Sequence, residues 1–191
     1  LPIFWGCRRL PDGPLRERIA AVSSRAGVSF SELYAWDLGG GALINAAAVG
    51  LLPPFRYLFV SRALLRSLPP EEVDAVVAHE LAHVKHGHVL FYIVFTVGMM
   101  ELLQAGLAAL PLSAYEQAVA FLAALAVHIR FIFAYCSRRL ERQADLGALT
   151  WLGTAEPLCQ GLERIAYLSG DVRSVPSWHH LSVAERVMPR G

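Results

Sequence analysis

The spacing of apolar and polar residues divides the chain into amphipathic segments on either side of a long apolar centre. Residues 14–26 (PLRERIAAVSSRA) have the spacing of a short surface helix that Gly27 ends. Between Val28 and Arg62, the β-prone pieces SELYAWD and RYLFVSR are separated by a run of glycines and by Pro53-Pro54, which predicts a small sheet or hairpin. An edge strand of such a sheet is a candidate for binding a peptide.

The centre of the chain is predicted to be helical and apolar. A helix starts at Leu68-Pro69-Pro70-Glu71-Glu72, runs through AVVAHELAHVKHGH without a breaker, and enters an apolar stretch from Val89 to Leu110. A second apolar stretch, Ala118 to Cys136, follows a short polar link and is interrupted by His128 and Arg130. Each stretch approaches the roughly 20 residues that cross a bilayer, so together they predict a helical membrane hairpin.

Composition makes lipid contact the default expectation. The chain has 55% hydrophobic and 17% charged residues and a mean hydropathy of +0.43. A net charge of +1 without a basic run argues against nucleic acid as a partner, and three widely spaced cysteines predict no disulfide framework. We expect one domain over residues 1–191, in a fragment of a longer membrane protein because the chain starts at Leu1.

Basic residues cluster at the outer ends of the predicted hairpin. Lys85 precedes the first apolar stretch and Arg138, Arg139 and Arg142 follow the second, whereas the link between the two carries only Glu116. The positive-inside rule then places both outer ends in the cytoplasm. We therefore expect a membrane protein in which the HELAH segment faces the cytoplasm.

The segment His79-Glu80-Leu81-Ala82-His83 carries the candidate chemistry. On a helix, His79 and His83 project from one face about 6 Å apart, a separation that a tetrahedral zinc ion bridges. Glu80 then lies beside the water that the metal activates, where it takes a proton and passes it to the leaving amine. This pattern predicts metal-assisted peptide hydrolysis with one Zn²⁺ per chain.

Glu141 is the candidate for the third zinc ligand. Asp145 follows it at i+4 on the same face and can accept a hydrogen bond from a zinc-bound imidazole. His83 and Glu141 would stand roughly 9 and 8 Å from the ends of their spans, and therefore at similar heights. The alternative is that Glu141 is an exposed charge. His86 lies roughly 7–8 Å along the axis, too far to bind the metal, and is expected at the membrane interface with His88.

These motifs together resemble the membrane gluzincin peptidases, which include the HtpX-type heat-shock membrane proteases and the CAAX prenyl proteases. The resemblance spans about Ile19 to Arg186 and rests on Asn45-Ala46, the helix from Leu68 to His83, Gly87-His88, the hairpin, and Ser137 to Asp145. It implies an α+β fold, mainly helical with a small β-sheet. In that fold a membrane hairpin is inserted into a zincin-like domain, between the HExxH helix and the Glu-ligand helix.

The resemblance also implies roles that the spacing alone does not. Asn45 would bind the substrate backbone. His180 and Arg186 correspond to the family's C-terminal His and Arg, which stabilise the oxyanion and order the site. Leu181 replaces the usual Pro and His179 is adjacent, so either His179 or His180 is the candidate oxyanion residue.

Three functions are compatible with the sequence. The leading one is a multi-pass endopeptidase that cleaves membrane-associated or misfolded proteins at the cytoplasmic face of a bacterial inner membrane. The second is the zinc-protease module of a membrane signal transducer, similar to antirepressor receptors, and the third is a non-catalytic zinc-binding membrane scaffold. A prenyl-CAAX substrate is possible but not favoured, because two spans cannot enclose the large intramembrane chamber expected of that branch unless many other spans are missing from this sequence.

Overall fold

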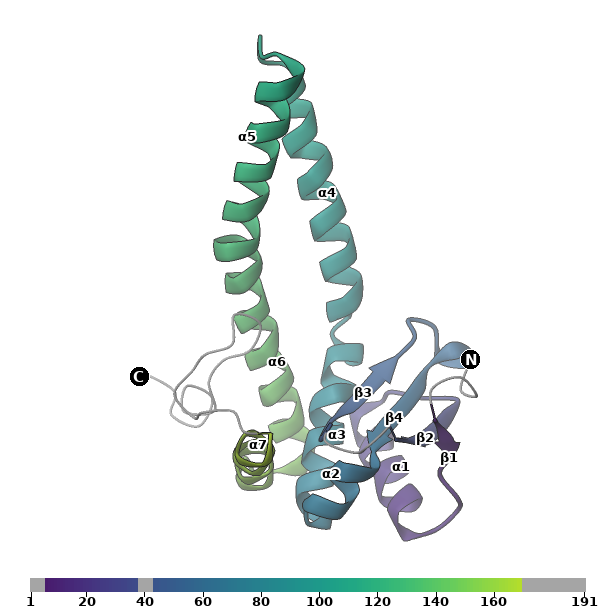
Figure 1. Cartoon of the computed structure of the whole chain (residues 1–191). Helices are drawn as coiled ribbons and strands as arrows, with labels where there is room; N and C mark the ends of the chain where they lie inside the picture. The colour runs from purple at the N-terminus through teal and green to yellow at the C-terminus, as the bar shows by residue number, and fades with distance from the viewer. Residues whose placement is uncertain (1–5, 38–42, 170–191) are drawn as a thin grey trace.

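A small sheet lies at one side of the domain. The computed structural model describes residues 6–37 and 43–169, with a four-stranded sheet in the order β1-β2-β4-β3 (Figure 1). The strands are β1 (Arg8–Arg9), β2 (Glu32–Trp36), β3 (Ala46–Val49) and β4 (Tyr57–Ser61). The two predicted β-prone pieces became β2 and β4, which pair in parallel, so the hairpin is formed instead by β3 and β4. The sequence AAAV has little β-propensity, and β3 was not predicted.

The central helix, α3 (Pro70–Lys85), is covered on several sides. It packs against α1 (Pro14–Ala26), β3, α6 (Ala134–Leu152) and α7 (Glu156–Leu168). Between sheet and helices lies the core, with Ile19, Leu33, Leu58, Leu64 and Leu81 at most 2% exposed. The short helices η2 (Pro53–Phe55) and α2 (Arg62–Ser67) complete the domain, and Ser61 caps α2 by accepting from the Leu64 N–H.

The expectation that the α3 helix continues into the apolar stretch is wrong. Helix α3 ends at Lys85, Gly87 has a left-handed φ of 67°, and α4 (His88–Ala108) begins as a separate helix. A left-handed residue at this position is favourable only for glycine, and it redirects the chain. The metal-site helix and the first apolar helix are therefore distinct elements.

Two long apolar helices project from the domain. Helix α4 and helix α5 (Ala114–Val127) lie side by side, and α5 continues through a π-helical turn, η3 (His128–Phe133), into α6 (Figure 1). At the tip, Ser113 and Glu116 form a reciprocal capping box. Both helical stretches, His88–Ala108 and Ala114–Leu152, are long and apolar enough to cross a membrane, and their apolar windows are 0% and 11% buried.

Helix α7 is tied to α3 by an ion pair. Glu72, only 3% exposed, accepts hydrogen bonds from Arg164 Nε at 2.9 Å and Nη2 at 3.0 Å. A bidentate pair of this kind satisfies a carboxylate that would otherwise be buried without a partner. The pair holds α7 against the first turns of α3.

Helices α3 and α6 approach closely at Gly147. A Cβ at this position would lie 2.9 Å from the Ala82 Cβ. Ala82 precedes His83, and Gly147 lies on the helix that carries Glu141, so the spacing of the two helices sets the spacing of these side chains.

We expect Gly147→Val to force α3 and α6 apart and to lower the free energy of unfolding by about 1–3 kcal/mol, the cost typical of overpacking. Denaturant unfolding in detergent measures this loss. Gly106→Val in α4 is the matched control, because nothing lies within 4 Å of a Cβ there. Equal stability of the two variants would contradict the close packing.

Candidate metal centre

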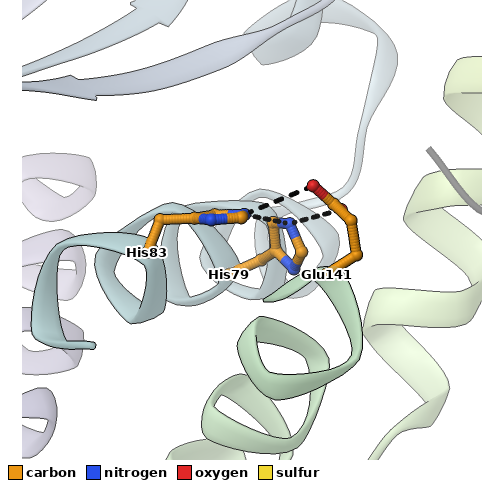
Figure 2. A group of neighbouring side chains, drawn as sticks. All are labelled: His79, His83 and Glu141. Carbon is orange, nitrogen blue, oxygen red and sulfur yellow. Dashed lines mark hydrogen bonds and ion pairs between the residues drawn. The ribbon is translucent and has the colours of Figure 1, made fainter. Parts of the chain in front are cut away.

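Two helices bring three potential metal ligands together. His79 and His83 lie on α3 and Glu141 on α6, and all three side chains point toward one point (Figure 2). His79 and Glu141 are 6% and 5% exposed, so Glu141 is not an exposed surface charge. The structure thus places together the three residues that the sequence singled out.

The donor atoms have the separations of a tetrahedral site. His79 Nε2 lies 3.0 Å from His83 Nε2 and 3.5 Å from Glu141 Oε2, and His83 Nε2 lies 3.7 Å from Glu141 Oε1. Ligands bound at about 2.0–2.2 Å in tetrahedral geometry stand roughly 3.3 Å apart. The three side chains therefore fit a single small metal ion without rearrangement.

Asp145 orients one of the two imidazoles. Its Oδ1 lies 3.0 Å from His79 Nδ1, one helical turn beyond Glu141 on α6. With His79 Nε2 directed at the centre, Nδ1 carries the proton and donates a hydrogen bond to Asp145. This contact fixes the Nδ1-protonated tautomer, which leaves Nε2 free to bind a metal. The i+4 spacing noted in the sequence corresponds to this contact.

The second imidazole is oriented by a different chain of hydrogen bonds. His83 Nδ1 lies 2.8 Å from His88 Nδ1, His88 Nε2 lies 3.1 Å from Gln143 Oε1, and Gln143 Nε2 lies 3.3 Å from His86 Nδ1. Because the Gln143 carbonyl only accepts, His88 donates from Nε2 and its Nδ1 accepts from His83. Each link thus has one direction, leading from the centre to the exposed His86.

His88 was expected at the membrane interface with His86, and the structure corrects this. His88 is 1% exposed and contacts His83 directly. On one continuous helix, a residue five positions after His83 would face away from it, but the left-handed Gly87 turns His88 back. A Gly soon after the last helical residue is a helix-stop signal that points to this break. For Gln143 we find no comparable sequence signal.

The remaining candidate residues differ in where they lie. Glu80 is half-buried on α3 next to His79. Asn45 is exposed at the start of β3, where its Oδ1 accepts from the Ala46 N–H and its own N–H donates to Ser61 Oγ. The candidates His179, His180 and Arg186 lie outside the described residues.

Two imidazoles from an HExxH helix and a carboxylate from a second helix form the donor set of a metallopeptidase. Residues 9–184 match peptidase family M48, and the chain belongs to this family. The expected resemblance to membrane gluzincins is thereby confirmed.

Two proteins similar to this chain are protease HtpX homologues, consistent with this family. A protease HtpX homologue of Herminiimonas arsenicoxydans is 30% identical over 171 residues, covering 79% of this chain and 57% of that protein. One from Bordetella petrii is 29% identical over 170 residues, covering 81% and 56%. The chain therefore spans little more than half of these relatives.

A solved structure has a similar fold. The crystal structure of S. mikatae Ste24p superposes with a TM-score of 0.79 at 23% sequence identity, over 97% of this chain and 51% of that one. At this identity the similarity concerns the fold, which is mostly helical with a small mixed sheet.

We expect His88→Ala to weaken metal binding by about 10–100-fold, because His83 loses the group that fixes its ring. The dissociation constant for zinc, measured by chelator competition, reports this without any assay of activity. His86→Ala is the matched control, because this exposed residue ends the hydrogen-bond chain. Unchanged affinity in a folded His88→Ala protein would contradict the positioning role.

Proposed function

We propose that this chain is the catalytic region of a zinc-dependent endopeptidase that cleaves membrane-associated or misfolded proteins. The observation that carries the proposal is the convergence of His79 Nε2, His83 Nε2 and the Glu141 carboxylate in a mostly buried site. Membership of peptidase family M48 supports it.

The donor set favours zinc over other common ions. Two imidazole nitrogens and one carboxylate oxygen suit zinc, whereas magnesium and calcium prefer oxygen ligands alone. One ion per chain accounts for all three side chains. When bound, zinc supplies a Lewis acid that polarises a carbonyl and acidifies water.

Several side chains of the protein have separate proposed roles in the reaction. Glu80 neighbours His79 on α3 and is the proposed general base, which would accept a proton from the attacking water and deliver it to the leaving amine. Asp145 and His88 hold the two imidazoles in the tautomers that direct Nε2 to the centre. His180, or its neighbour His179, and Arg186 are the proposed partners of the oxyanion.

Strand β3 is the proposed binding edge for the substrate. It pairs with β4 on one side, forms an edge of the described sheet, and packs near α3. An extended peptide added to this edge would lie beside the helix that carries His79 and Glu80. Asn45, exposed at the start of β3, would then bind the peptide backbone through its amide.

Helices α4 and α5 are the proposed membrane anchor. Exposed large side chains cover them, among them Val94 at 63%, Leu102 at 68% and Leu122 at 63%. With Lys85 and Arg138 at the base and Glu116 at the tip, the positive-inside rule favours a cytoplasmic catalytic centre. We propose a multi-pass protein of a bacterial inner membrane, in contact with the lipid bilayer.

Glu80→Gln should reduce casein cleavage by about 100- to 10,000-fold, because the amide cannot accept the proton of the water. Activity of the full-length protein in detergent, measured together with its zinc content, tests this. Glu71→Gln, an exposed substitution in the first turn of the same helix, should cleave casein normally.

The metal itself provides the complementary test. A chelator should abolish cleavage, and added zinc should restore it. Cleavage by metal-free protein, or by Glu80→Gln with its zinc bound, would rule out the proposed mechanism.

Asn45→Ala should raise KM for a peptide substrate by about tenfold, the effect of losing one or two hydrogen bonds, with a smaller change in kcat. Steady-state kinetics with a fluorogenic peptide separate the two constants. Gln160→Ala on α7 is a comparison variant with an exposed amide on another element. An unchanged KM would remove Asn45 from the binding edge.

A further inference from the structure

The turn between β3 and β4 exposes a cluster of large apolar side chains. Its residues Leu51, Leu52, Pro53, Pro54 and Phe55, here named the LLPPF turn, carry no polar side chain. Leu51 is 52%, Leu52 61% and Phe55 65% exposed, and Val49 at the end of β3 is 53% exposed. Isolated exposed apolar residues are common, but a contiguous group of this kind indicates an interaction surface.

Four backbone carbonyls of this turn, those of Leu51, Leu52, Pro53 and Pro54, are paired with protein groups. Arg56, 9% exposed, turns its guanidinium inward and donates to the carbonyls of Leu51 at 2.8 Å and Gly50 at 3.3 Å. The Phe55 N–H donates to the Leu52 carbonyl at 2.9 Å. The Ser31 hydroxyl lies 2.5 Å from the Pro54 carbonyl and 3.2 Å from that of Pro53.

The pairing of these carbonyls affects whether the turn can move from water into the lipid bilayer. A backbone carbonyl that leaves water without a partner costs several kcal/mol in hydrocarbon, so irregular backbone avoids lipid. In the LLPPF turn, Arg56 and Ser31 satisfy carbonyls from within the domain, and the two prolines have no N–H to satisfy. This pairing lowers the cost for the turn to leave water while it presents leucine and phenylalanine side chains.

The position of the turn matches that of the apolar helices. Figure 1 shows the connection between β3 and β4 on the side of the domain from which α4 and α5 project, level with the start of α4. Exposed apolar side chains begin there on α4 as well, with Val89 at 50% and Leu90 at 52%. The turn and the base of the apolar helices thus reach the same height.

We propose that the LLPPF turn inserts into the headgroup region of the bilayer that α4 and α5 cross, as a second membrane contact of the catalytic domain. The inference rests on the proposed membrane function. Lipid is favoured over a protein partner because all five residues of the turn are apolar and the turn lies level with the exposed apolar side chains at the base of α4.

Insertion would also orient the substrate edge. The LLPPF turn follows β3 directly, so its depth in the bilayer fixes the height of this strand above the membrane. A substrate segment leaving the bilayer would meet the edge of β3 at a defined distance from the lipid surface.

Spin labels in the full-length protein test the proposal. In a background with Cys7, Cys136 and Cys159 replaced by Ser, single cysteines are introduced as Leu52→Cys, Phe55→Cys, Ile93→Cys and Tyr167→Cys, and each is labelled with a nitroxide. The proteins are reconstituted in vesicles of phosphatidylethanolamine and phosphatidylglycerol. Collision rates with oxygen and with a water-soluble nickel chelate give the depth of each label.

The two reference positions make the outcome specific. Ile93, 49% exposed on α4, reports whether the hairpin is in lipid, and Tyr167, 76% exposed on α7 at the opposite end of the domain, should report water (Figure 1). We expect oxygen-accessible, nickel-protected labels at Leu52 and Phe55, about 5–10 Å below the phosphate level.

Three results would overturn the inference. If the label at Ile93 is in lipid while those at Leu52 and Phe55 collide with nickel, the turn lies in water and the proposed membrane anchor still holds. If the labels in the turn are protected from both reagents, protein covers the turn. If the label at Ile93 also lies in water, the membrane function itself fails, and the inference fails with it.

Discussion

The packing of α3 against α6 is the contact on which the candidate site depends. One helix contributes two imidazoles and the other a carboxylate, and neither has the three ligands alone. Their donor atoms stand 3.0–3.7 Å apart because Gly147 lets α6 approach Ala82, one residue before His83. A small residue in one helix thus determines a distance between side chains in two.

The orientation of the ligands depends on groups one step further out. Each imidazole has its own partner on the side away from the centre, Asp145 for His79 and His88 for His83. The two partners differ in kind, since one is a carboxylate and the other a neutral imidazole. The carboxylate raises the basicity of the metal-facing nitrogen of its histidine more than the imidazole does. The membership of family M48 and the structural similarity to Ste24p concern the family and the overall fold. The contacts of Asp145 and His88 come from the side chains of this chain itself.

Most of the candidate site could be predicted from the sequence, because its members are related by helical spacing. His79 and His83 are one turn apart, as are Glu141 and Asp145, and an i/i+4 relation holds wherever the helix forms. The position of His88 could not be predicted from an uninterrupted helix, because one left-handed residue at Gly87 changed its direction. Strand β3 was missed for a different reason, since its alanines gain their strand conformation from pairing with β4 rather than from local preference.

The break at Gly87 also makes the two halves of the site mechanically unequal. From Ala114 to Leu152 the chain is helical throughout, with apolar residues in α5, a π-helical segment at His128–Phe133, and Glu141 in α6. Helix α3, which carries the two histidines, does not continue into an apolar helix in this way, because Gly87 separates it from α4. A tilt of α4 relative to α3 can be taken up at Gly87, whereas α5 is joined to the helix that carries Glu141 through helical residues only, with the π-helical segment His128–Phe133 between them. If α4 and α5 cross a bilayer as proposed, a change in bilayer thickness would therefore act differently on the two sides of the site, with Gly87 between the membrane and the histidines and the π-helical segment between the membrane and Glu141.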